Sequence, residues 1–489
     1  MGKYKEMKQD FWNGNIIRFL EHLFDVFILG LTFLLIAELN YLENNHSFLG
    51  IYDLFVLHSD DILVTALYLI IAAFFFMVYQ VTISRSKFYK VFISMFMALF
   101  FTNIILIIIT FINVDNFILG TPLDVLYILI AQVIILPSVK YIEFVLFNKF
   151  SRKPLVAVIG PKEDAINLAK EFFMDKTHYK VLKYVLFEDD RVKINDDVFK
   201  YIDEVDHVYL LDDLSVKNKN MLVNYILLNT SKELYMVPRT YELGLLYAQK
   251  DQIDDTLVLK AKSMRLTFEQ RFFKRSFDIV VSIVGLIVAF IPMLIIALLI
   301  KIQDGGPILY RQTRIKRNNE EFEIVKFRSM HVNCDAMTGP VHAGAKDPRI
   351  TKLGRFIRAT RLDELPQIFN VLKGEMSIVG PRPLIPSEIE ETIETHPEFM
   401  YRSNVKPGLT GMSQVYSRYD TMGIERLRYD LFYIRRYNFW LDIKLILLTV
   451  RVMFDKEAGL GKMNEAEKFS EYLKKTIMND NIILFNEKE

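Results

Sequence analysis

The chain has 489 residues, of which 52% are hydrophobic, with a mean hydropathy of +0.20 and a net charge of +1. This composition is too apolar for an ordinary soluble protein, and it lacks the positive excess expected of a nucleic-acid-binding protein. Cys334 is the only cysteine, which excludes an intramolecular disulfide and a cysteine-based metal site.

Four apolar windows in the first third of the chain predict membrane-spanning helices, since about 20 apolar residues cross a bilayer. They lie at about 23–42, 62–83, 91–112 and 123–147. Asp25 and Glu38 interrupt the first window, and Pro137, Lys140 and Glu143 weaken the fourth. Residues 1–150 are therefore predicted to form a four-helix transmembrane module.

The charges between these windows predict their orientation. Basic residues precede the first window, separate the second from the third and follow the fourth, whereas the other loops contain acidic residues and neither Lys nor Arg. Basic loops stay in the cytoplasm, so both ends of the module are expected there. The polar start lacks a small-residue cleavage site, and we expect no cleaved signal peptide.

A fifth apolar run, 277–300, is also long enough to span a membrane. Basic residues flank it on both sides, and Pro292 lies inside it, where a proline kinks a helix. We expect a re-entrant helix, broken at Pro292, that enters and leaves the same side of the membrane. The alternative is a kinked fifth span, which would place the rest of the chain outside the cell.

Residues 151–245 predict a Rossmann-like α/β domain. A buried strand is expected at 155–159, and strand-like runs at 180–187, 205–211 and 233–237 alternate with helical stretches. Gly160 follows the first strand, but the other glycines of a dinucleotide-binding fingerprint are missing. A regulatory or dimerising role without bound nucleotide is the better interpretation. The charged residues 246–270 predict a linker.

The remaining residues, 271–489, hold most of the chemically informative motifs. A basic stretch from Arg311 to Arg317 is suited either to anionic lipid headgroups or to the phosphates of a substrate. A turn is expected at Asp304–Pro307 before it, and the basic segment 326–330 follows.

The strongest candidate reaction centre is the carboxylate pair Asp363–Glu364. Pro366 is acceptable in the first turn of a helix, which predicts a helix that starts near Asp363. Its apolar face would contain Leu365, Ile368, Phe369 and Leu372. A helix start favours anions, and a carboxylate there can act as nucleophile or hold Mg²⁺. From this block alone, a simple N-cap role for Asp363, paired with upstream arginines, is equally favoured.

Three segments after this pair complete the pattern. Pro381 and Pro383 restrict the backbone around Arg382, whose guanidinium suits phosphate. A loop follows at 406–411, and an amphipathic stretch rich in aromatic and basic residues extends to Phe454. Such a stretch is typical of a helix that lies in the membrane interface.

In this order the blocks resemble the bacterial sugar transferase family, the polyprenyl-phosphate hexose-1-phosphate transferases that start exopolysaccharide, capsule and O-antigen synthesis. The resemblance covers about 270–489. It rests on the segments 274–278, 306–307, 326–330, 362–367, 380–383 and 406–411 together with the proline-broken helix. The four spans and the α/β domain look like the N-terminal module of the long family members, whose domain resembles a CoA- or NAD-binding fold.

The resemblance implies a mostly α catalytic domain with a re-entrant helix, a need for Mg²⁺, and a two-step transfer from a UDP-hexose to undecaprenyl phosphate. It implies that Asp363 attacks the sugar-bearing phosphate and expels UMP, while Glu364 supports the metal or acts as base. Phosphate contacts are implied for Lys326, Arg328, Arg358 and Arg382. Uridine or sugar contacts are expected near Gln414 and Arg418.

The chain departs from the family pattern in two places. Lys316 and Asn319 stand where members commonly have glycines, and Met412-Ser413-Gln414 stands where an aromatic residue is expected after Gly411. The second departure weakens the expected contacts of Gln414 and Arg418.

Further expectations follow from the family: glucose or galactose as the sugar, a homodimer, and the bacterial inner membrane with the catalytic domain on its cytoplasmic face. A catalytically inactive membrane scaffold is the alternative, and the intact carboxylate pair argues against it. A transporter is disfavoured because the apolar windows show no paired charges.

Overall fold

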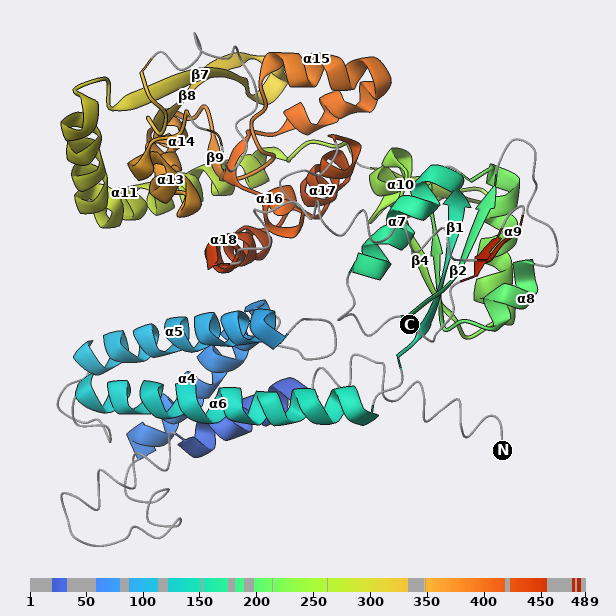
Figure 1. Ribbon diagram of the computed structural model, residues 1–489, viewed down its shortest axis with the longest axis horizontal. Coiled ribbons are helices and arrows are strands. Elements are labelled where there is room, and N and C mark those ends of the chain that lie inside the picture. Colours follow the sequence, from blue (N-terminus) through green and yellow to red (C-terminus); the bar gives the residue numbers. More distant parts are fainter. Residues whose placement is uncertain are drawn as a thin grey trace, which may run out of the picture. The chain divides into compact units, whose positions relative to one another are not determined.

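Figure 1 shows the computed structural model of the chain. The structure describes residues 20–32, 59–79, 88–112, 122–150, 153–174, 181–188, 198–212, 214–261, 263–332, 347, 349–417, 423–454, 477–479 and 482–484. The chain divides into two compact units, Met1–Met236 with Asn464–Glu489 and Val237–Met463.

Apolar helices open the first unit. A helical segment at 20–32 is followed by α4 (Ser59–Tyr79), α5 (Phe88–Ile112) and α6 (Pro122–Phe150). Three helices of the described ranges are long and apolar enough to cross a membrane: Phe88–Ile109, Leu126–Phe147 and Phe268–Asp304. The second predicted window overlaps α4, whose apolar part Ala66–Tyr79 is shorter, and the first window extends beyond the described residues.

One buried amide links these helices. The side chain of Gln132 on α6 is fully buried, and its Nε2 donates to the hydroxyl of Tyr68 at 2.8 Å and of Thr32 at 3.3 Å. Its Oε1 accepts from Nδ2 of Asn103 at 3.2 Å. Polar groups in apolar surroundings are stable only when hydrogen bonded, so this amide favours one arrangement of the four segments.

An ion pair joins the first and last of these segments. Nζ of Lys140 lies 2.7 Å from Oδ1 of Asp25 and 2.9 Å from Oε2 of Glu143, and Lys140 and Asp25 are each 1% exposed. The expectation that the apolar windows contain no paired charges is therefore wrong. Helix packing brings the two charges together, and each offsets part of the cost of burying the other.

A parallel sheet follows the helices. It contains β1 (Leu155–Pro161), β2 (Val181–Glu188), β3 (His207–Leu210) and β4 (Glu233–Met236) in the order β2-β1-β3-β4. The helices of this part are α7 (Lys162–Met174), α8 (Val198–Asp203) and α9 (Val216–Asn229). Side chains of β1 to β3 and of α8 and α9 form one apolar core. The predicted alternation of strands and helices is confirmed.

The turn after β1 is poorly suited to phosphate. A Cβ atom added at Gly160 would lie 2.4 Å from Cδ1 of Leu211, so a leucine side chain fills the space beside the glycine. Glu163 and Asp164 occupy the first turn of α7, where their charge opposes an anion. Both features support a domain that binds no nucleotide at this turn.

Two short strands near the C-terminus extend this sheet. β11 (Ile477–Asn479) pairs with β12 (Ile482–Leu484), which pairs antiparallel with β2. The sequence assigned everything after 271 to the catalytic domain, and for these strands that assignment is wrong. Edge pairing is a backbone property, so the short apolar runs alone did not reveal the partner.

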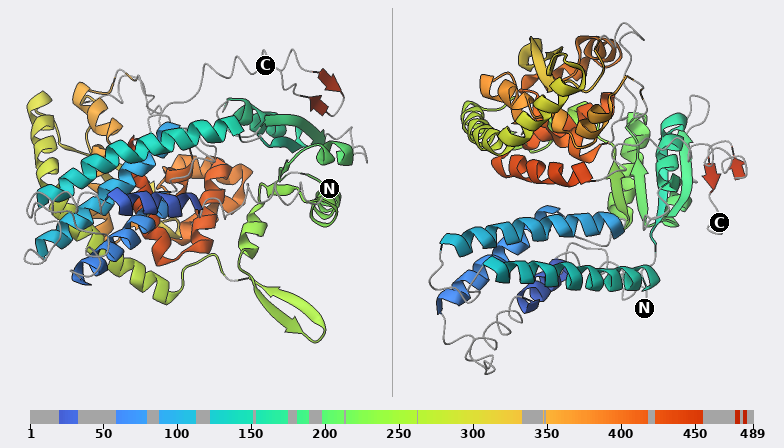
Figure 2. Two further views of the ribbon diagram at one scale, coloured as in Figure 1. Left: turned by 90° about the horizontal axis from the view of Figure 1, so that it is seen from below. Right: turned by 60° about the vertical axis from the view of Figure 1, so that its left-hand side comes forward.

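The second unit begins with α10 (Thr240–Leu245), which packs on α17 (Gly423–Arg436). Arg428 and Arg435 of α17 donate to the carbonyls of Pro238 at 3.2 Å and Leu246 at 2.6 Å. The predicted linker 246–270 contains an antiparallel hairpin, β5 (Gln249–Ile253) and β6 (Thr256–Lys260). Its residues are largely exposed, and the hairpin projects from its unit in Figure 2.

Helix α11 (Phe268–Asp304) has 37 residues and contains Pro292. It changes direction sharply along its length in Figures 1 and 2, and an internal proline is the usual cause of such a kink. Near the start of the helix Lys274 forms an ion pair with Asp442 of the same unit. At its end Asp304 forms an ion pair with Arg328. A straight helix of this length would separate its ends by about 55 Å. The bend instead returns both ends to one domain, as re-entry requires.

The rest of this unit is built from short elements. They are β7 (Leu309–Ile315), η2 (Arg317–Asn319), β8 (Glu321–Phe327), α13 (Lys352–Ala359), η3 (Leu362–Glu364), α14 (Gln367–Lys373), β9 (Ser377–Val379), α15 (Pro386–Thr395), η4 (Pro397–Asn404), β10 (Gly408–Thr410), α16 (Met412–Tyr416), α17 and α18 (Phe439–Phe454). Ile296 and Ile300 of α11 pack with Phe327 of β8 and Ile357 of α13. This core fixes β8 beside the turn that holds the carboxylate pair.

The hairpin β7–β8 accounts for one departure from the family pattern. Asn318 and Asn319 have φ values of 63° and 60°, a left-handed conformation that asparagine adopts more readily than most residues. Asn319 thus takes the conformation for which a glycine would otherwise be suited. Lys316 has a φ of −107° and needs no glycine.

Candidate active site

Asp363 and Glu364 lie in the 3₁₀ turn η3, between α13 and α14. The α-helix predicted to start near Asp363 starts later, at Gln367, with Pro366 as its N-cap. Arg361, directly before the turn, has a φ of 55°. A non-glycine residue in the left-handed region carries strain of a kind found at functional sites, and here it reverses the chain so that the carboxylates face β8.

Asp363 is the buried member of the pair, with 9% of its surface exposed. It forms no ion pair with any residue that the structure describes. Burial, and then the charge of Glu364, raise its pKa to about 6, against the opposing effect of Lys326 and Arg358. A carboxylate with this pKa is mostly ionised at neutral pH and more basic than an ordinary aspartate, which suits a nucleophile.

Glu364 has the opposite electrostatics. Burial would raise its pKa, but Lys326 and then Arg382 outweigh that effect and lower the pKa to about 2. Nζ of Lys326 lies 2.9 Å from Oε1 of Glu364, and a terminal nitrogen of Arg382 lies 3.5 Å from the same oxygen. The two adjacent carboxylates are therefore held in different states, one paired with cations and one not.

Two interlocking loops position Arg382. The parallel strands β9 and β10 place Gly380 against the 406–411 loop. A Cβ atom at Gly380 would lie 2.4 Å from the carbonyl oxygen of Lys406, and one at Gly408 would lie 2.1 Å from the nitrogen of Gly380. Only glycine permits this approach. The two glycine-rich blocks found in the sequence are thus one structural unit.

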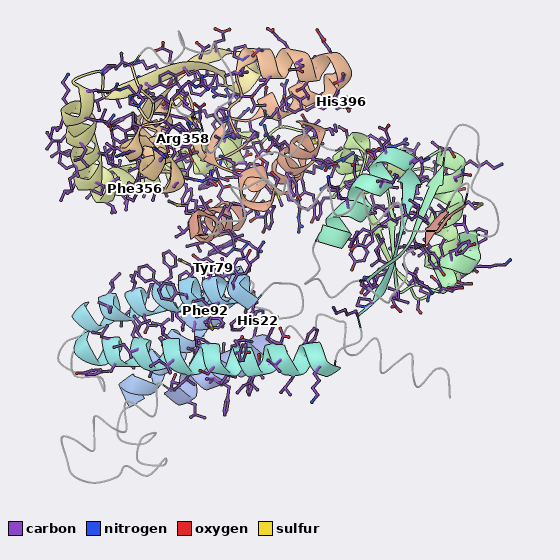
Figure 3. All side chains as sticks on the ribbon, viewed as in Figure 1. His22, Tyr79, Phe92, Phe356, Arg358 and His396 are labelled. Carbon is purple, nitrogen blue, oxygen red and sulfur yellow. The ribbon has the colours of Figure 1, made fainter. Side chains whose placement is uncertain are left out.

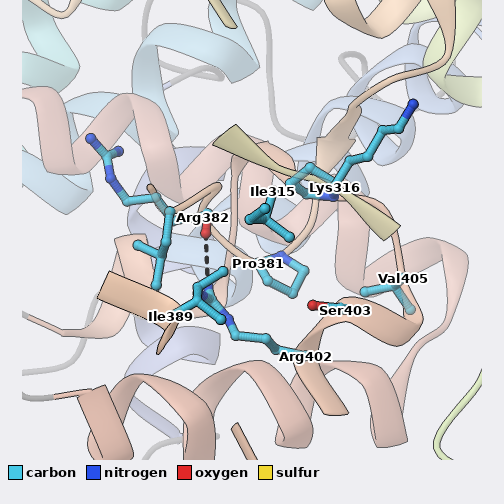
Figure 4. Close-up of a pocket in the computed structure, with 10 residues that line it drawn as sticks. Ile315, Lys316, Pro381, Arg382, Ile389, Arg402, Ser403 and Val405 are labelled. Atoms are coloured by element: carbon cyan, nitrogen blue, oxygen red, sulfur yellow. Dashed lines mark hydrogen bonds between the residues drawn. The ribbon is translucent and has the colours of Figure 1, made fainter. Parts of the chain in front are cut away.

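A buried arginine supports the same loop. Arg402 donates to the carbonyl of Arg382 at 2.7 Å, as Figure 4 shows. Arg402 is held by Asp430 at 2.9 Å, and Oδ1 of Asp430 accepts a hydrogen bond from Ser413 at 3.0 Å. This chain of contacts fixes the backbone from which Arg382 reaches Glu364.

Arg358 completes the cationic surroundings of Asp363. It lies in the last turn of α13 and lowers the pKa of Asp363. In Figure 3 it lies among packed side chains, whereas Phe356 on the same helix lies at the edge of the domain and is exposed. Helix α13 thus presents a basic side to the site and an apolar side outward.

Two other predicted site residues make their contacts elsewhere. Arg328 is buried and pairs with Asp304 at the end of α11, with NH1 2.8 Å from Oδ2. Gln414 donates to the carbonyl of Leu409 at 3.0 Å and so packs on its own loop. Arg418 is outside the described residues. Phe369, expected on the apolar face of α14, is exposed.

Two basic residues near the site were missed in the sequence. Arg402 supports Arg382 as described, and Arg426 of α17 has its pKa lowered by burial and then by Arg382 and Arg402. Neither belongs to a proline- or glycine-rich block. The sequence of α17, with basic residues at 426, 428, 435 and 436, offered no signal that one of them faces the loop of Arg382.

The carboxylates of the site are also candidate ligands for a metal ion. Among the described residues no group of three or more His, Cys, Asp or Glu side chains could hold a metal. Mg²⁺ commonly binds one or two carboxylates together with water and substrate phosphates. Asp363 and Glu364 meet this smaller requirement, so the pair fits Mg²⁺ when a phosphate substrate supplies further ligands.

Residues 269–456 match the family model described as "Bacterial sugar transferase". Over these residues the chain is similar to the bacterial sugar transferase family. The matched region contains α11 from Glu269 onward, both carboxylates, Lys326 and Arg382.

Curated relatives agree with this assignment. The chain is 37% identical over 257 residues to the UDP-glucose:undecaprenyl-phosphate glucose-1-phosphate transferase of Klebsiella pneumoniae, covering 50% of this chain and 54% of the relative. It is 40% identical over 231 residues to the enzyme of the same name from Xanthomonas campestris pv. campestris, covering 46% and 48%. It is 37% identical over 219 residues to the undecaprenyl-phosphate galactose phosphotransferase of Salmonella typhimurium, covering 42% and 45%. The chain thus spans about half the length of the curated relatives it matches.

Proposed function

We propose that this protein transfers glucose 1-phosphate or galactose 1-phosphate from a UDP-hexose to undecaprenyl phosphate. The proposal rests on the state of the carboxylate pair. Asp363 is buried, has a raised pKa and forms no ion pair with the residues that the structure describes, while Lys326 and Arg382 hold Glu364 ionised beside it. The similarity of the domain to enzymes with these substrates in their names supports the choice of reaction.

The reaction proceeds in two displacements at one phosphorus. An oxygen of Asp363 attacks the phosphate that carries the sugar, the bond to UMP breaks, and UMP leaves with the bonding electrons. An oxygen of undecaprenyl phosphate then attacks the same phosphorus and Asp363 leaves. The products are UMP and undecaprenyl diphosphohexose, and the enzyme is regenerated. A covalent intermediate divides one difficult transfer into two easier ones.

Glu364 serves this reaction through its charge. A carboxylate with a pKa near 2 is a weak proton acceptor at neutral pH, so the base role implied by the family is less suited to it than the metal role. Asp363 and Glu364 would hold Mg²⁺, which supplies charge to the phosphates when bound. Lys326, Arg358 and Arg382 offset the remaining phosphate charge as it develops in the transition state.

Helix α11 provides the meeting point for a lipid and a nucleotide sugar. Its apolar side chains are largely exposed around the bend, among them Ile287, Val288 and Phe290, and both of its ends contact the domain that holds Asp363. We place α11 as a re-entrant helix in the inner membrane, with the domain on the cytoplasmic face where the basic loops of the first unit also lie.

The proposed product is the first lipid-linked sugar of an exopolysaccharide, capsule or O-antigen. A homodimer is proposed on family grounds. A catalytically inactive scaffold is not favoured, because the carboxylates and their cationic partners are all present in one site.

The test is transfer by the purified full chain in the presence of Mg²⁺. UDP-glucose and UDP-galactose are supplied separately with undecaprenyl phosphate, and UMP release and the lipid product are measured. With UDP-hexose alone, a phosphohexose is expected on the peptide that contains Asp363. Unchanged turnover in Asp363→Ala would exclude the covalent mechanism, and absence of UMP release with every UDP-sugar would exclude the function.

A further inference from the structure

A second basic site lies in the sugar transferase domain, apart from the carboxylate pair. It is a cavity of about 180 Å³ between the first turns of α11, the η2 segment and the loop before β10. Roughly 10–15 Å³ of such space holds one water molecule, so the cavity accepts a much larger group. Its charged lining residues are Arg271, Lys274, Arg275, Asp278, Arg317 and Lys406.

Some of these charges already have partners. Lys274 pairs with buried Asp442 at 2.6 Å. Asp278 accepts hydrogen bonds from Ser377 Oγ at 2.9 Å and the nitrogen of Ile378 at 3.0 Å. Arg275 donates to the carbonyls at the end of α14, at 2.6 and 2.7 Å. The backbone and the core thus hold three of the six charged groups in place.

The other three are cations without an acidic partner. Arg271, Arg317 and Lys406 form no ion pair in the part of the chain that the structure describes. A Cβ atom at Gly374 would lie 3.4 Å from Nζ of Lys406 and 3.5 Å from a nitrogen of Arg275, so like charges flank one glycine. The pKa of Lys406 is lowered by burial and then by Arg275. A cavity lined by cations in this way raises the local concentration of anions and favours a bound one.

The cavity is separate from the reaction centre. Asp363 precedes the start of α14, and Arg275 contacts the end of that helix. Seven helical residues span about 10 Å. A phosphate in the cavity is therefore out of reach of the Asp363 carboxylate.

Its position indicates the source of the anion. Arg271 and Arg275 lie in the first turns of α11, next to the exposed Phe272 and Phe273 and just before the apolar run. In the proposed membrane placement these turns are at the level of the lipid headgroups, where basic pockets between helices take lipid phosphates. This placement rests on the proposed function, whereas the cavity and its charge do not.

We propose that the cavity binds the phosphate headgroup of an anionic phospholipid, as a resident ligand that takes no part in the transfer. Arg271, Arg317 and Lys406 contact the phosphate. Because they come from α11, η2 and the loop before β10, the bound headgroup ties the start of the membrane helix to the loop that also positions Arg382.

Native mass spectrometry of the full chain in nonionic detergent tests this. Phosphatidylglycerol, phosphatidylcholine, glycerol 3-phosphate and undecaprenyl phosphate are added in separate titrations. Wild type is expected to retain one phosphatidylglycerol and not phosphatidylcholine. Affinity should fall about fivefold for each cation removed in Arg317→Gln and in Arg271→Gln/Lys406→Gln. The matched control is Arg311→Gln, an exposed arginine paired with Glu323 outside the cavity, which should bind as wild type does.

Three outcomes overturn the proposal. Equal phosphatidylglycerol binding by wild type and the folded cavity variants would show that the lipid does not bind in the cavity. Glycerol 3-phosphate that binds as tightly as the lipid makes it a site for soluble phosphates. Stoichiometric displacement by undecaprenyl phosphate makes it the acceptor's site. UMP release is measured on the same preparations. A chain that retains the lipid but releases no UMP contradicts the proposed function and leaves the cavity assignment intact.

Discussion

The membrane helices contain the buried Asp25 and the sugar transferase domain contains the buried Asp363, and the two side chains differ in their partners. Asp25 lies 2.7 Å from Lys140. Asp363 has no ion pair among the described residues, and Lys326, whose charge acts on it, is bound to its neighbour Glu364. A buried charge with a partner favours one arrangement of the elements that carry the pair. A buried charge without a partner destabilises the folded state but leaves the group available for reaction. Pairing therefore distinguishes the two aspartates better than burial does.

Removing one partner of the membrane pair is expected to have the largest effect on stability. Lys140→Ala leaves Asp25 buried and uncompensated, which costs about 3–5 kcal/mol. The measurement is the unfolding midpoint of the full chain in lipid nanodiscs. The double variant Asp25→Leu/Lys140→Met should recover most of the loss. Equal stability of Lys140→Ala and wild type would contradict the structural role of the pair.

In the transferase domain, removal of the cation beside Glu364 is expected to affect the rate of transfer. Lys326→Gln removes the closest cation from Glu364 and from the phosphates of the substrate, and the rate of UMP release should fall by about 10²–10³. Lys316→Gln is the matched control, since Lys316 pairs with Glu320 at 3.3 Å on the same hairpin. A similar loss in both variants would show that the effect comes from the hairpin as a whole.

Asp363→Asn should stabilise the domain while it abolishes transfer. The pKa of Asp363 is raised to about 6, so the folded state holds the proton more tightly than the unfolded chain. Ionisation therefore costs stability as pH rises from about 4 through 6, and about 3 kcal/mol is lost above that range. Asparagine does not ionise. Unfolding midpoints of variant and wild type should differ at pH 8 and converge below pH 4, and no difference at pH 8 would contradict the unpaired state.

The pH dependence of transfer should show a smaller and more gradual effect. With Asp363 as nucleophile, kcat/KM is expected to fall about tenfold per pH unit below pH 6. Glu364 titrates near pH 2 and adds no second step in that range. UMP release at low UDP-hexose concentration, measured from pH 5 to pH 8, gives the profile. An unchanged kcat/KM between pH 6 and pH 5, as an aspartate with an ordinary pKa would give, would mean that Asp363 is neither buried nor close to a second negative charge in solution.

The sequence singled out the carboxylate pair and Arg382, but not the residues that support them. Asp363 and Glu364 adjoin Pro366, and Arg382 follows one short strand later, so local pattern was enough. Arg402 acts through contacts with Arg382 and Asp430, which are 20 and 28 residues away. Such contacts depend on how loops fold over one another, and no local periodicity encodes them. The pairing of Arg328 with Asp304 was also not predicted, since Asp304 looked like an ordinary turn residue in the sequence.

The same distinction holds for the fold. Strands and helices of the α/β part followed from runs of apolar residues. The Asp25–Lys140 pair was not predictable in this way, because the pattern of one helix does not say which other helix it meets. The hairpin 249–260 was missed because its residues are exposed and lack the alternation that a half-buried strand would show.

The pairing of β12 with β2 also affects the order of folding. During synthesis β2 emerges long before Ile482–Leu484, and until then one side of the parallel sheet presents unpaired backbone amides and carbonyls. The membrane helix α11 and the whole transferase domain are made in that interval. Closure of this edge has a high contact order and is slow for that reason, so the nascent chain is most exposed to strand-mediated association while its catalytic domain is being completed.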